Sequence, residues 1–294
     1  MRIAVTGREG QVVQSLIERS ARDGSNHIVI PLGRPDLDLA DVSSVRSALA
    51  AARPDAIVSA AAYTAVDKAE SDPDMAFVVN AIGAGAVAEA AAALGVPLVH
   101  LSTDFVFDGS KPGLYVETDP TAPLGVYGAS KLAGEQAVLA AHNDSAILRT
   151  AWVYSPFGAN FLKTMLRLAA DRDELGVVAD QMGNPTSALD IADTVLRVVE
   201  RLKDDSAANL RGVFHMTSNG GISWAGFAEA IFAASVAHGG PTAKVRHIPS
   251  TDYPTPARRP ANSRLDCTKL AGNYGIDLGH WTQAVDPIVA RYLS

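Results

Sequence analysis

The sequence predicts an α/β fold in which a doubly wound parallel sheet is followed by a smaller C-terminal α/β domain. In the first half of the chain, short β-branched runs alternate with longer helical patterns, which is the order of parallel βαβ units. The runs are almost continuously apolar, as strands covered on both faces are. After about residue 150 the alternation gives way to loops rich in proline, glycine and aromatic residues. The 294 residues suffice for two such units.

The expected elements follow one another closely in the first half. Runs of Ile, Val, Leu and Ala bounded by polar or turn residues predict strands at 3–6, 27–30, 56–58 and 98–101. Apolar residues three or four positions apart predict helices at 11–22, 42–52 and 76–94. We therefore place a first domain at residues 1–150 and a second at 151–294. A later strand near 212–218 would return to the first sheet.

The composition excludes several classes of protein. A net charge of -7 and a pI near 5.5 oppose nucleic-acid binding, which requires concentrated positive charge. No uninterrupted apolar run reaches the ~18 residues of a membrane span, since Glu89 and His100 interrupt the longest candidate. The N-terminus has no signal-peptide pattern and the chain has one cysteine, so we expect a cytoplasmic protein without a membrane partner. The histidines have no metal-ligand spacing, and no metal is expected.

A glycine-rich turn joins the first strand to the first helix. Gly7 and Gly10 have the spacing at which the first glycine permits a tight turn and the second lets a pyrophosphate approach the backbone. Val13 occupies the third position, where glycine would let helix and strand pack closely. A branched side chain there should push the helix outward or be met by small neighbours such as Ala4. The turn predicts a dinucleotide site of the Rossmann type in the first domain.

The end of the second expected strand indicates which nicotinamide cofactor is bound. An NAD site commonly places an acidic residue there for the ribose 2′-hydroxyl, whereas this sequence has Arg34 after Gly33. An arginine suits a 2′-phosphate, and Arg8 could assist it. We therefore expect NADPH, with NADH also usable; Arg34 is otherwise an ordinary surface residue.

Two features carry chemistry. Tyr127 and Lys131 are four residues apart and share one face of an expected helix. An ammonium beside a phenol lowers its pKa from about 10, so that the tyrosine can protonate a ketone oxygen during hydride transfer. Thr103 follows the strand at 98–101, at the sheet edge where ligands bind, and its hydroxyl could donate to the same oxygen. A Tyr/Lys pair alone also occurs by chance on exposed helices.

Taken together, the motifs resemble the extended short-chain dehydrogenase/reductases, and the resemblance covers nearly the whole chain. Within that family they are most similar to reductases of nucleotide-linked keto sugars. The stretches that carry the resemblance are GxxGQ from Gly7, AAAYTAVDKAESDP from Ala60, VNAIGAGAVAEAA from Val79, LSTDFVFDG from Leu101, PLGVYGASKLAGE from Pro123, LRTAWVYS from Leu148, NFLKTMLRLA from Asn160, DQMGNPT from Asp180 and ARRPANSRLD from Ala257.

The resemblance implies NADPH-dependent reduction of the 4-keto group of dTDP-4-dehydro-L-rhamnose to dTDP-L-rhamnose. It implies that Tyr127 donates the proton, that Lys131 binds the nicotinamide ribose and tunes Tyr127, and that Thr103 binds the keto oxygen. The implied cofactor contacts are Gly10, Gln11 and Val12 at the pyrophosphate, Asp38 and Leu39 at the adenine, and Ala61, Ala62 and Tyr63 along the cofactor. The implied contacts of the nucleotide sugar are Thr103, Asp104 and Trp152, and among the downstream arginines we expect Arg259 to contact its phosphates.

Three alternatives stay open. Two are other family members, a nucleotide-sugar epimerase and a dehydratase, which would share most of these motifs. Dehydratases usually carry an additional acid beside the threonine, whereas here Asp104 is followed by Phe105. A third alternative is a non-catalytic subunit resembling the one that partners methionine adenosyltransferase. The alanine-rich helix at 80–94 would also permit a contact between two copies of the chain, so a homodimer is open.

Overall fold

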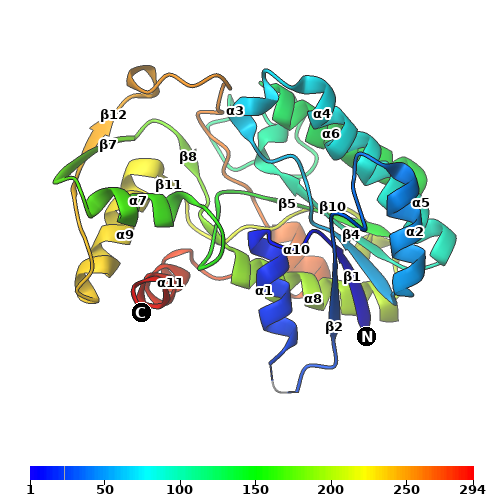
Figure 1. Ribbon diagram of the computed structural model, residues 1–294. Coiled ribbons are helices and arrows are strands. Elements are labelled where there is room, and N and C mark those ends of the chain that lie inside the picture. Colours follow the sequence, from blue (N-terminus) through cyan, green and yellow to red (C-terminus); the bar gives the residue numbers. More distant parts are fainter. Residues whose placement is uncertain (23) are drawn as a thin grey trace.

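A six-stranded parallel sheet forms the centre of the structure, a computed structural model that describes residues 1–22 and 24–294 (Figure 1). Its order is β10-β5-β4-β3-β1-β2, and every neighbouring pair is parallel. The expected parallel sheet is confirmed. The strands are β1 (Arg2–Thr6), β2 (Ile28–Leu32), β3 (Ala56–Ser59), β4 (Leu98–Thr103), β5 (Ser145–Thr150) and β10 (Gly212–His215).

The order of the strands determines where a ligand can bind. From β1 the chain moves outward to β2, then returns to the other side of β1 and continues through β3, β4 and β5. The direction of winding thus reverses between β1 and β3. In open α/β sheets a crevice forms beyond the carboxyl ends of the strands at such a point.

Helices cover both faces of this sheet, and a separate apolar cluster lies between the sheet and the helices on each face. One face is covered by α1 (Gln11–Ser20), α8 (Ala188–Asp204) and α10 (Thr268–Tyr274). The other is covered by α2 (Val42–Ala52), α5 (Ala84–Leu94) and α6 (Val126–Ala141). Because successive residues of a strand face opposite sides, Ile3 and Val5 lie in the first cluster and Ala4 in the second.

The helix expected at 76–94 is longer and contains a local change of winding. It runs from α4 (Pro73–Phe77) through a π turn, η1 (Val78–Gly83), into α5, and the short α3 (Val66–Ala69) precedes it. By length and composition the stretch Pro73–Leu94 could cross a membrane, although one such helix is weak evidence and 44% of its most apolar window is buried. Its α5 portion packs between the sheet, α2 and α6, as the core helix of a globular protein does.

The second half of the chain builds a separate apolar core. That core lies among α7 (Phe161–Ala169), α9 (Trp224–Ala237), α11 (Thr282–Leu293) and the parallel pair β7 (Glu174–Val178) and β12 (Lys244–Ile248). Two short strand pairs connect this part to the main sheet: β6 (Val153–Tyr154) with β9 (Thr186–Ser187), and β8 (Met182–Gly183) with β11 (Ile222–Ser223). Short 3₁₀ turns are η2 (Asp104–Val106), η3 (Ala208–Leu210) and η4 (Ser250–Asp252).

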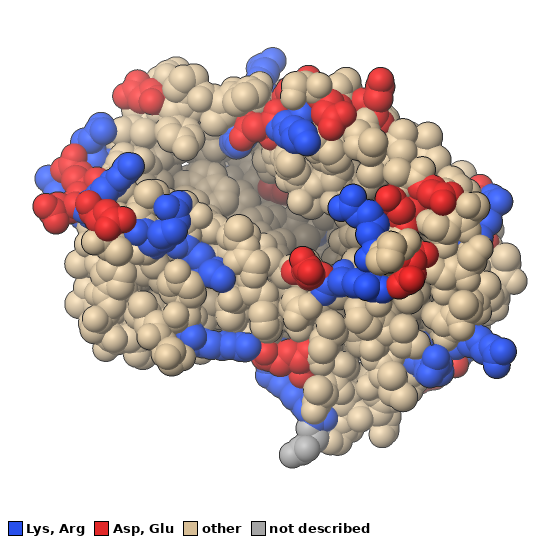
Figure 2. Space-filling view, viewed as in Figure 1, with Lys and Arg blue, Asp and Glu red and all other residues tan. Residues whose placement is uncertain are grey.

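Several elements of the second half complete the first. β10 pairs with β5, and α8 and α10 pack on the first face of the main sheet. A domain boundary at residue 150 stays a prediction, with these later segments added to the first unit. Figure 2 shows the molecule hollowed between its two parts, and Lys and Arg side chains are interspersed with Asp and Glu on this face.

Candidate active site

The loop after β1 has the backbone of a phosphate-binding turn. Gly7 has a φ of +102°, which side chains rarely permit, and its N–H donates to the carbonyl of Leu32 at 2.6 Å. Gly10 is the N-cap residue of α1, so the partial positive charge and free N–H groups of that helix lie at the turn. The two glycines therefore leave the backbone open to an anionic group.

Val13, at the third glycine position, is buried beneath this turn. Its Cγ2 atom lies 3.3 Å from the place of a Cβ on Gly7 and 3.9 Å from that of a Cβ on Gly10. The prediction that Ala4 accommodates this side chain is wrong, because Ala4 belongs to the cluster on the opposite face of the sheet. The space for the valine comes instead from the two glycines of the turn.

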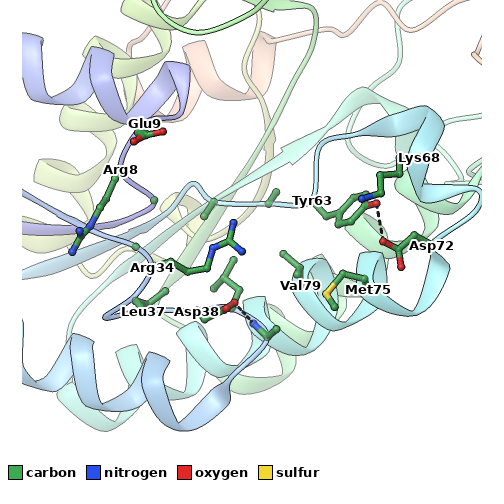
Figure 3. A pocket seen from close by; sticks show the side chains of 16 residues that line it. Arg8, Glu9, Arg34, Leu37, Asp38, Tyr63, Lys68, Asp72, Met75 and Val79 are labelled. Atoms are coloured by element: carbon green, nitrogen blue, oxygen red, sulfur yellow. Dashed lines mark hydrogen bonds between the residues drawn. The ribbon is translucent and has the colours of Figure 1, made fainter.

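A cavity of about 760 Å³ opens beyond the carboxyl ends of β1, β2 and β3 (Figure 3). Its size is that of a small-molecule site. The residues expected along the cofactor that line it are Gly7, Arg34, Asp38, Leu39, Ala61, Ala62 and Tyr63. The cavity also has lining that was not expected, contributed by Lys68 of α3, Asp72 immediately before α4, Met75 of α4 and Val79 of η1.

Two arginines lie at the end of β2 with different partners. The Arg34 side chain is exposed and extends into the cavity in Figure 3. Arg8 is ion-paired with Asp36, and both side chains are largely exposed. Since β2 ends without an acidic residue that could accept from a ribose 2′-hydroxyl, Arg34 gives this end of the cavity the charge that a 2′-phosphate requires.

Gln11 and Val12 follow Gly10 at the start of α1 and are not among the residues lining the cavity. The Gln11 side chain turns toward the second part of the molecule. Its Oε1 accepts from Ser155 Oγ at 2.8 Å and from Asn160 Nδ2 at 3.0 Å, and its Nε2 donates to the Val153 carbonyl at 3.4 Å. Gln11 therefore connects the cofactor helix to the loop after β6.

Tyr127 lies in the first turn of α6, next to Thr103 at the end of β4. Burial raises the pKa of Tyr127 to about 12; the nearby Thr103 hydroxyl lowers it, and the charge of Asp104 raises it further. Lys131 is not among the groups that shift this pKa here, and its tuning of the phenol stays a prediction. The phenol therefore keeps its proton at neutral pH, as a proton donor must.

Lys131 is buried one turn further along α6. Its Nζ donates to the Leu101 carbonyl at 2.7 Å and lies 3.5 Å from Nε2 of His100. Burial lowers the pKa of Lys131 to about 8, and the charge of Glu135 opposes this shift. The ammonium is thus held against β4, on the same helix face as Tyr127.

A buried ion pair lies directly behind these groups. Glu135 accepts from Arg149 Nε at 2.8 Å and from its Nη2 at 2.6 Å, and also from Ser102 Oγ. Ser102 and Arg149 are register partners on β4 and β5, so the Glu135 carboxylate joins α6 to both strands. The sequence did not reveal these contacts, because Arg149 and Ser102 are 14 and 33 residues from Glu135 in the chain.

Asn80 is a second residue that the sequence did not reveal. It is buried in the π turn η1, where its amide accepts from Tyr63 N at 2.7 Å and donates to the Tyr63 carbonyl at 3.1 Å and to Ser130 Oγ at 3.0 Å. Because Ser130 adjoins Lys131, Asn80 joins the cavity wall to the helix that carries Tyr127 and Lys131. A π turn is a frequent device for presenting such a side chain.

Thr103 and Asp104 lie at the carboxyl end of β4 and are both buried. Thr103 Oγ1 donates to Asp104 Oδ1 at 3.0 Å and accepts from Phe105 N at 3.2 Å. Burial raises the pKa of Asp104 to about 6 against the opposing effects of Ser263 and Thr103. Its second carboxylate oxygen has no hydrogen-bond partner within the described chain.

Trp152 and Arg259 approach the site from the second half. Trp152 follows β5 with a φ of +45°, and its ring stacks on that of Trp224. Arg259 is ion-paired with Asp67 of α3 at 2.8 Å, so a loop of the second half is fixed to the first at this point. Arg258 is exposed. Arg264 donates to Asn262 at 2.7 Å and to the Pro112 carbonyl at 2.8 Å.

No cluster of three or more His, Cys, Asp or Glu side chains that could hold a metal occurs within residues 1–22 and 24–294. The polar groups that converge on the end of β4 are instead hydroxyls, an ammonium and a buried carboxyl. They suit acid catalysis at a carbonyl oxygen, at the same edge of the sheet as the cavity.

Comparison with known proteins agrees with this geometry. The model of the family described as RmlD substrate binding domain matches residues 1–294. A dTDP-4-dehydrorhamnose reductase of Sinorhizobium fredii is 53% identical over 98% of this chain and 97% of its own length. The enzyme of that name from Escherichia coli K12 is 41% identical over 97% of this chain and 96% of its own.

Solved structures resemble the chain over its full length as well. A dTDP-4-dehydrorhamnose reductase of Clostridium acetobutylicum has a TM-score of 0.91 and 36% identity, with all of both chains covered. The Bacillus anthracis enzyme of that name, solved in complex with NADP, has a TM-score of 0.90 and 35% identity over 98% of each chain. From its first residue to its last, this chain belongs to the RmlD substrate binding domain family, the family of the dTDP-4-dehydrorhamnose reductases.

Proposed function

We propose that this chain is an NADPH-dependent oxidoreductase that reduces the 4-keto group of dTDP-4-dehydro-L-rhamnose to dTDP-L-rhamnose, a step in L-rhamnose nucleotide-sugar synthesis. The observation that carries the proposal is the meeting of Tyr127 and Thr103 at the carboxyl end of β4, the edge of the sheet at which the cavity also opens. The names of relatives over the whole chain length supply the sugar and the nucleotide. The Bacillus anthracis relative in complex with NADP supports the cofactor.

The cavity residues fit the cofactor. The positive φ of Gly7 and the start of α1 suit its pyrophosphate, and Arg34 suits the 2′-phosphate that distinguishes NADPH from NADH. NADH, which lacks that group, remains usable with lower affinity. Gly10, Gln11 and Val12 would contact the pyrophosphate through backbone N–H groups, Asp38 and Leu39 would flank the adenine, and Ala61, Ala62, Tyr63 and Lys131 would line the rest.

The residues at the end of β4 supply the acid chemistry. When bound, NADPH provides the hydride that the carbonyl carbon accepts. Tyr127 donates its phenolic proton to the carbonyl oxygen, which becomes the alcohol, and the raised pKa keeps that proton in place until negative charge develops there. Thr103 donates a hydrogen bond to the same oxygen, and Lys131 holds positive charge close to the phenolate that remains.

The nucleotide sugar would lie in the hollow between the two parts of the molecule (Figure 2). Thr103, Asp104 and Trp152 would contact its sugar. Arg259 would approach its phosphates while paired with Asp67. A cytoplasmic location and a homodimer stay predictions of the sequence.

An assay of the purified chain with dTDP-4-dehydrorhamnose and NADPH tests the proposal. We expect loss of NADPH absorbance together with formation of dTDP-L-rhamnose. An epimerase would instead return an isomer without net oxidation of cofactor. A regulatory subunit would show no turnover while it binds and alters a partner enzyme, and that result would refute the proposal.

Tyr127→Phe tests the assignment of the acid. The variant should lose on the order of 10²- to 10⁴-fold in kcat while NADPH still binds, because only the hydroxyl is removed. Tyr274→Phe is the matched control, since Tyr274 is buried on α10 and its hydroxyl bonds the Leu210 carbonyl, away from the end of β4. Near-normal turnover by Tyr127→Phe would mean that another group gives the proton.

A further inference from the structure

Trp152 has a backbone conformation that its side chain does not favour. Its φ of +45° lies in the left-handed region, where residues other than glycine, asparagine and aspartate are uncommon. The carbonyl of Trp152 accepts from Thr186 N at 3.2 Å, at the start of the short β6–β9 pair. A strained residue keeps such a conformation only where its surroundings hold it there.

The surroundings of the Trp152 ring are dominated by a second indole. The ring centroids of Trp152 and Trp224 are 3.4 Å apart and the two planes are inclined by only 5°. Trp152 is partly buried, and one of its faces is therefore covered by Trp224. In the described part of the chain the Trp152 ring has no other aromatic neighbour within stacking distance.

Trp224 is itself fixed by the core of the second half. It is the first residue of α9, and the Ser223 side chain caps that helix by accepting from Gly226 N at 3.1 Å. Its ring lies 4.6 Å from that of Phe161, which in turn stacks on Phe227 at 5.6 Å. A continuous series of contacts between aromatic rings thus extends from Trp152 into the core of the second half.

Gly183 lies against the face of the Trp152 ring opposite Trp224. It pairs with Ile222 in the β8–β11 ladder, two residues before Trp224. A Cβ at Gly183 would fall 2.2 Å from Cε2 and 2.4 Å from Nε1 of the Trp152 indole. The ring therefore occupies the space that a side chain at Gly183 would need, and it is held between the Trp224 ring on one face and Gly183 on the other.

We infer that Trp224 is a positioning residue for the nucleotide sugar: stacked beneath Trp152, it holds the strained residue and its ring at the wall of the substrate site. The inference rests on the proposed function in one respect, that Trp152 contacts the sugar. Trp224 acts through Trp152, and Gly183 acts by leaving room for the same ring.

Kinetics of Trp224→Leu test this role. The variant keeps an apolar side chain but loses the stack, so we expect KM for dTDP-4-dehydrorhamnose to rise about 10-fold, the size of one lost aromatic contact. KM for NADPH should stay within about twofold, because the cavity at the ends of β1 to β3 is untouched. Trp224→Phe, which restores a ring, should recover most of the loss.

A double-mutant cycle separates an indirect role from an independent one. If Trp224 acts only through Trp152, the double variant Trp152→Ala/Trp224→Leu should bind the sugar no worse than Trp152→Ala alone. Losses that multiply would show that Trp224 has its own contact with the substrate, and they would overturn the inference.

Circular dichroism gives a readout that does not depend on activity. Two stacked indoles couple and produce an exciton couplet in the far ultraviolet, which should vanish in Trp224→Leu and in Trp152→Ala. Trp281→Phe is the matched control, because it removes the third tryptophan of the chain, in the same core but outside the stacked pair. It should keep both the couplet and the KM of the parent chain.

Gly183→Ala provides a second perturbation that retains both indoles. Its methyl group should displace the Trp152 ring, alter the couplet and raise the same KM, and it decides the matter if Trp224→Leu does not fold. A couplet lost without any change in sugar KM, in either variant, would overturn the inference. If the parent chain itself failed to reduce the sugar, the proposed function would fail, and that outcome is separate because it appears before any substitution is made.

Discussion

The buried pair of Glu135 and Arg149 offers a sharp test of how the helix bearing Tyr127 is held. Glu135→Gln removes the negative charge and leaves the Arg149 guanidinium without a counter-ion at 4% exposure. Removing one partner of a buried pair costs about 3–5 kcal/mol, because the remaining charge is desolvated and unpaired. That is a large share of the roughly 5–15 kcal/mol by which such proteins are stable.

Further variants divide this cost among its causes. Glu135→Leu/Arg149→Met removes both charges, and such exchanges often leave the free energy of unfolding unchanged. The remaining cost, about 1–3 kcal/mol, should come from the Ser102 hydroxyl, which loses its hydrogen-bond acceptor. Adding Ser102→Ala should recover that remainder. The expected order of stability is therefore single variant lowest, double variant intermediate and triple variant closest to the parent chain.

Urea unfolding followed by circular dichroism measures these free energies. The control is Glu89→Gln, which breaks the exposed pair between Arg46 and Glu89, with side chains 61% and 53% exposed, and should cost less than about 1 kcal/mol. If Glu135→Gln cost no more than Glu89→Gln, the carboxylate would not hold α6 to β4 and β5, and the reasoning would be refuted.

Three further predictions concern the cofactor turn and the buried acid. Arg34→Ala should raise KM for NADPH about 10- to 100-fold and leave KM for NADH nearly unchanged, because one charged hydrogen-bonding partner of the 2′-phosphate is lost. Steady-state kinetics with both cofactors check this. An equal rise in KM for both cofactors would contradict it. Val13→Gly should lower the free energy of unfolding in urea by about 3 kcal/mol, because a buried side chain is lost and a glycine is placed in a helix. The Kd for NADPH should stay within a few-fold of the parent value. A large gain in NADPH affinity would show that the missing third glycine limits binding. The pKa of Asp104 is raised from 3.8 to about 6, so the folded chain binds the extra proton between those values and its stability falls as pH rises through them. The Asn side chain of Asp104→Asn cannot ionise. The stability of this variant relative to the parent chain should therefore rise by about 3 kcal/mol between pH 4 and 7. Thermal unfolding of both chains across that range checks this, and a difference in stability that is constant with pH would exclude it.

Much of the first half could be predicted from the sequence, because each strand there is a contiguous apolar run and each helix has its own periodicity. The π turn at Val78–Gly83 could not, since it adds one residue to a helix whose alanine-rich pattern reads the same either way. The pair of β7 and β12 also escaped prediction, because charged, polar or glycine residues interrupt both apolar runs and 65 residues separate Val178 from Lys244. Their pairing depends on the packing of α9, which lies between them in sequence.

The candidate site shows the same division. Tyr127 and Lys131 were found because one helix fixes their spacing, and Gly7 and Gly10 because one turn does. Ala4 was wrongly paired with Val13, since the sequence does not reveal which face of a strand meets which helix. The partners of Glu135, Asn80 and Trp152 lie on other elements, and only the folded chain brings them together.

The Gln11 side chain has a thermodynamic consequence. It joins the first turn of α1 to Val153 of β6 and to the loop after β6, and β6 directly follows Trp152. A ligand that binds at the start of α1 is therefore linked, through the Gln11 side chain, to the wall of the sugar site. Coupling between two binding equilibria is reciprocal, so whatever factor the cofactor applies to the affinity for the sugar, the sugar applies to the affinity for the cofactor. At equilibrium each ligand therefore changes the affinity for the other by the same factor, whichever of the two binds first.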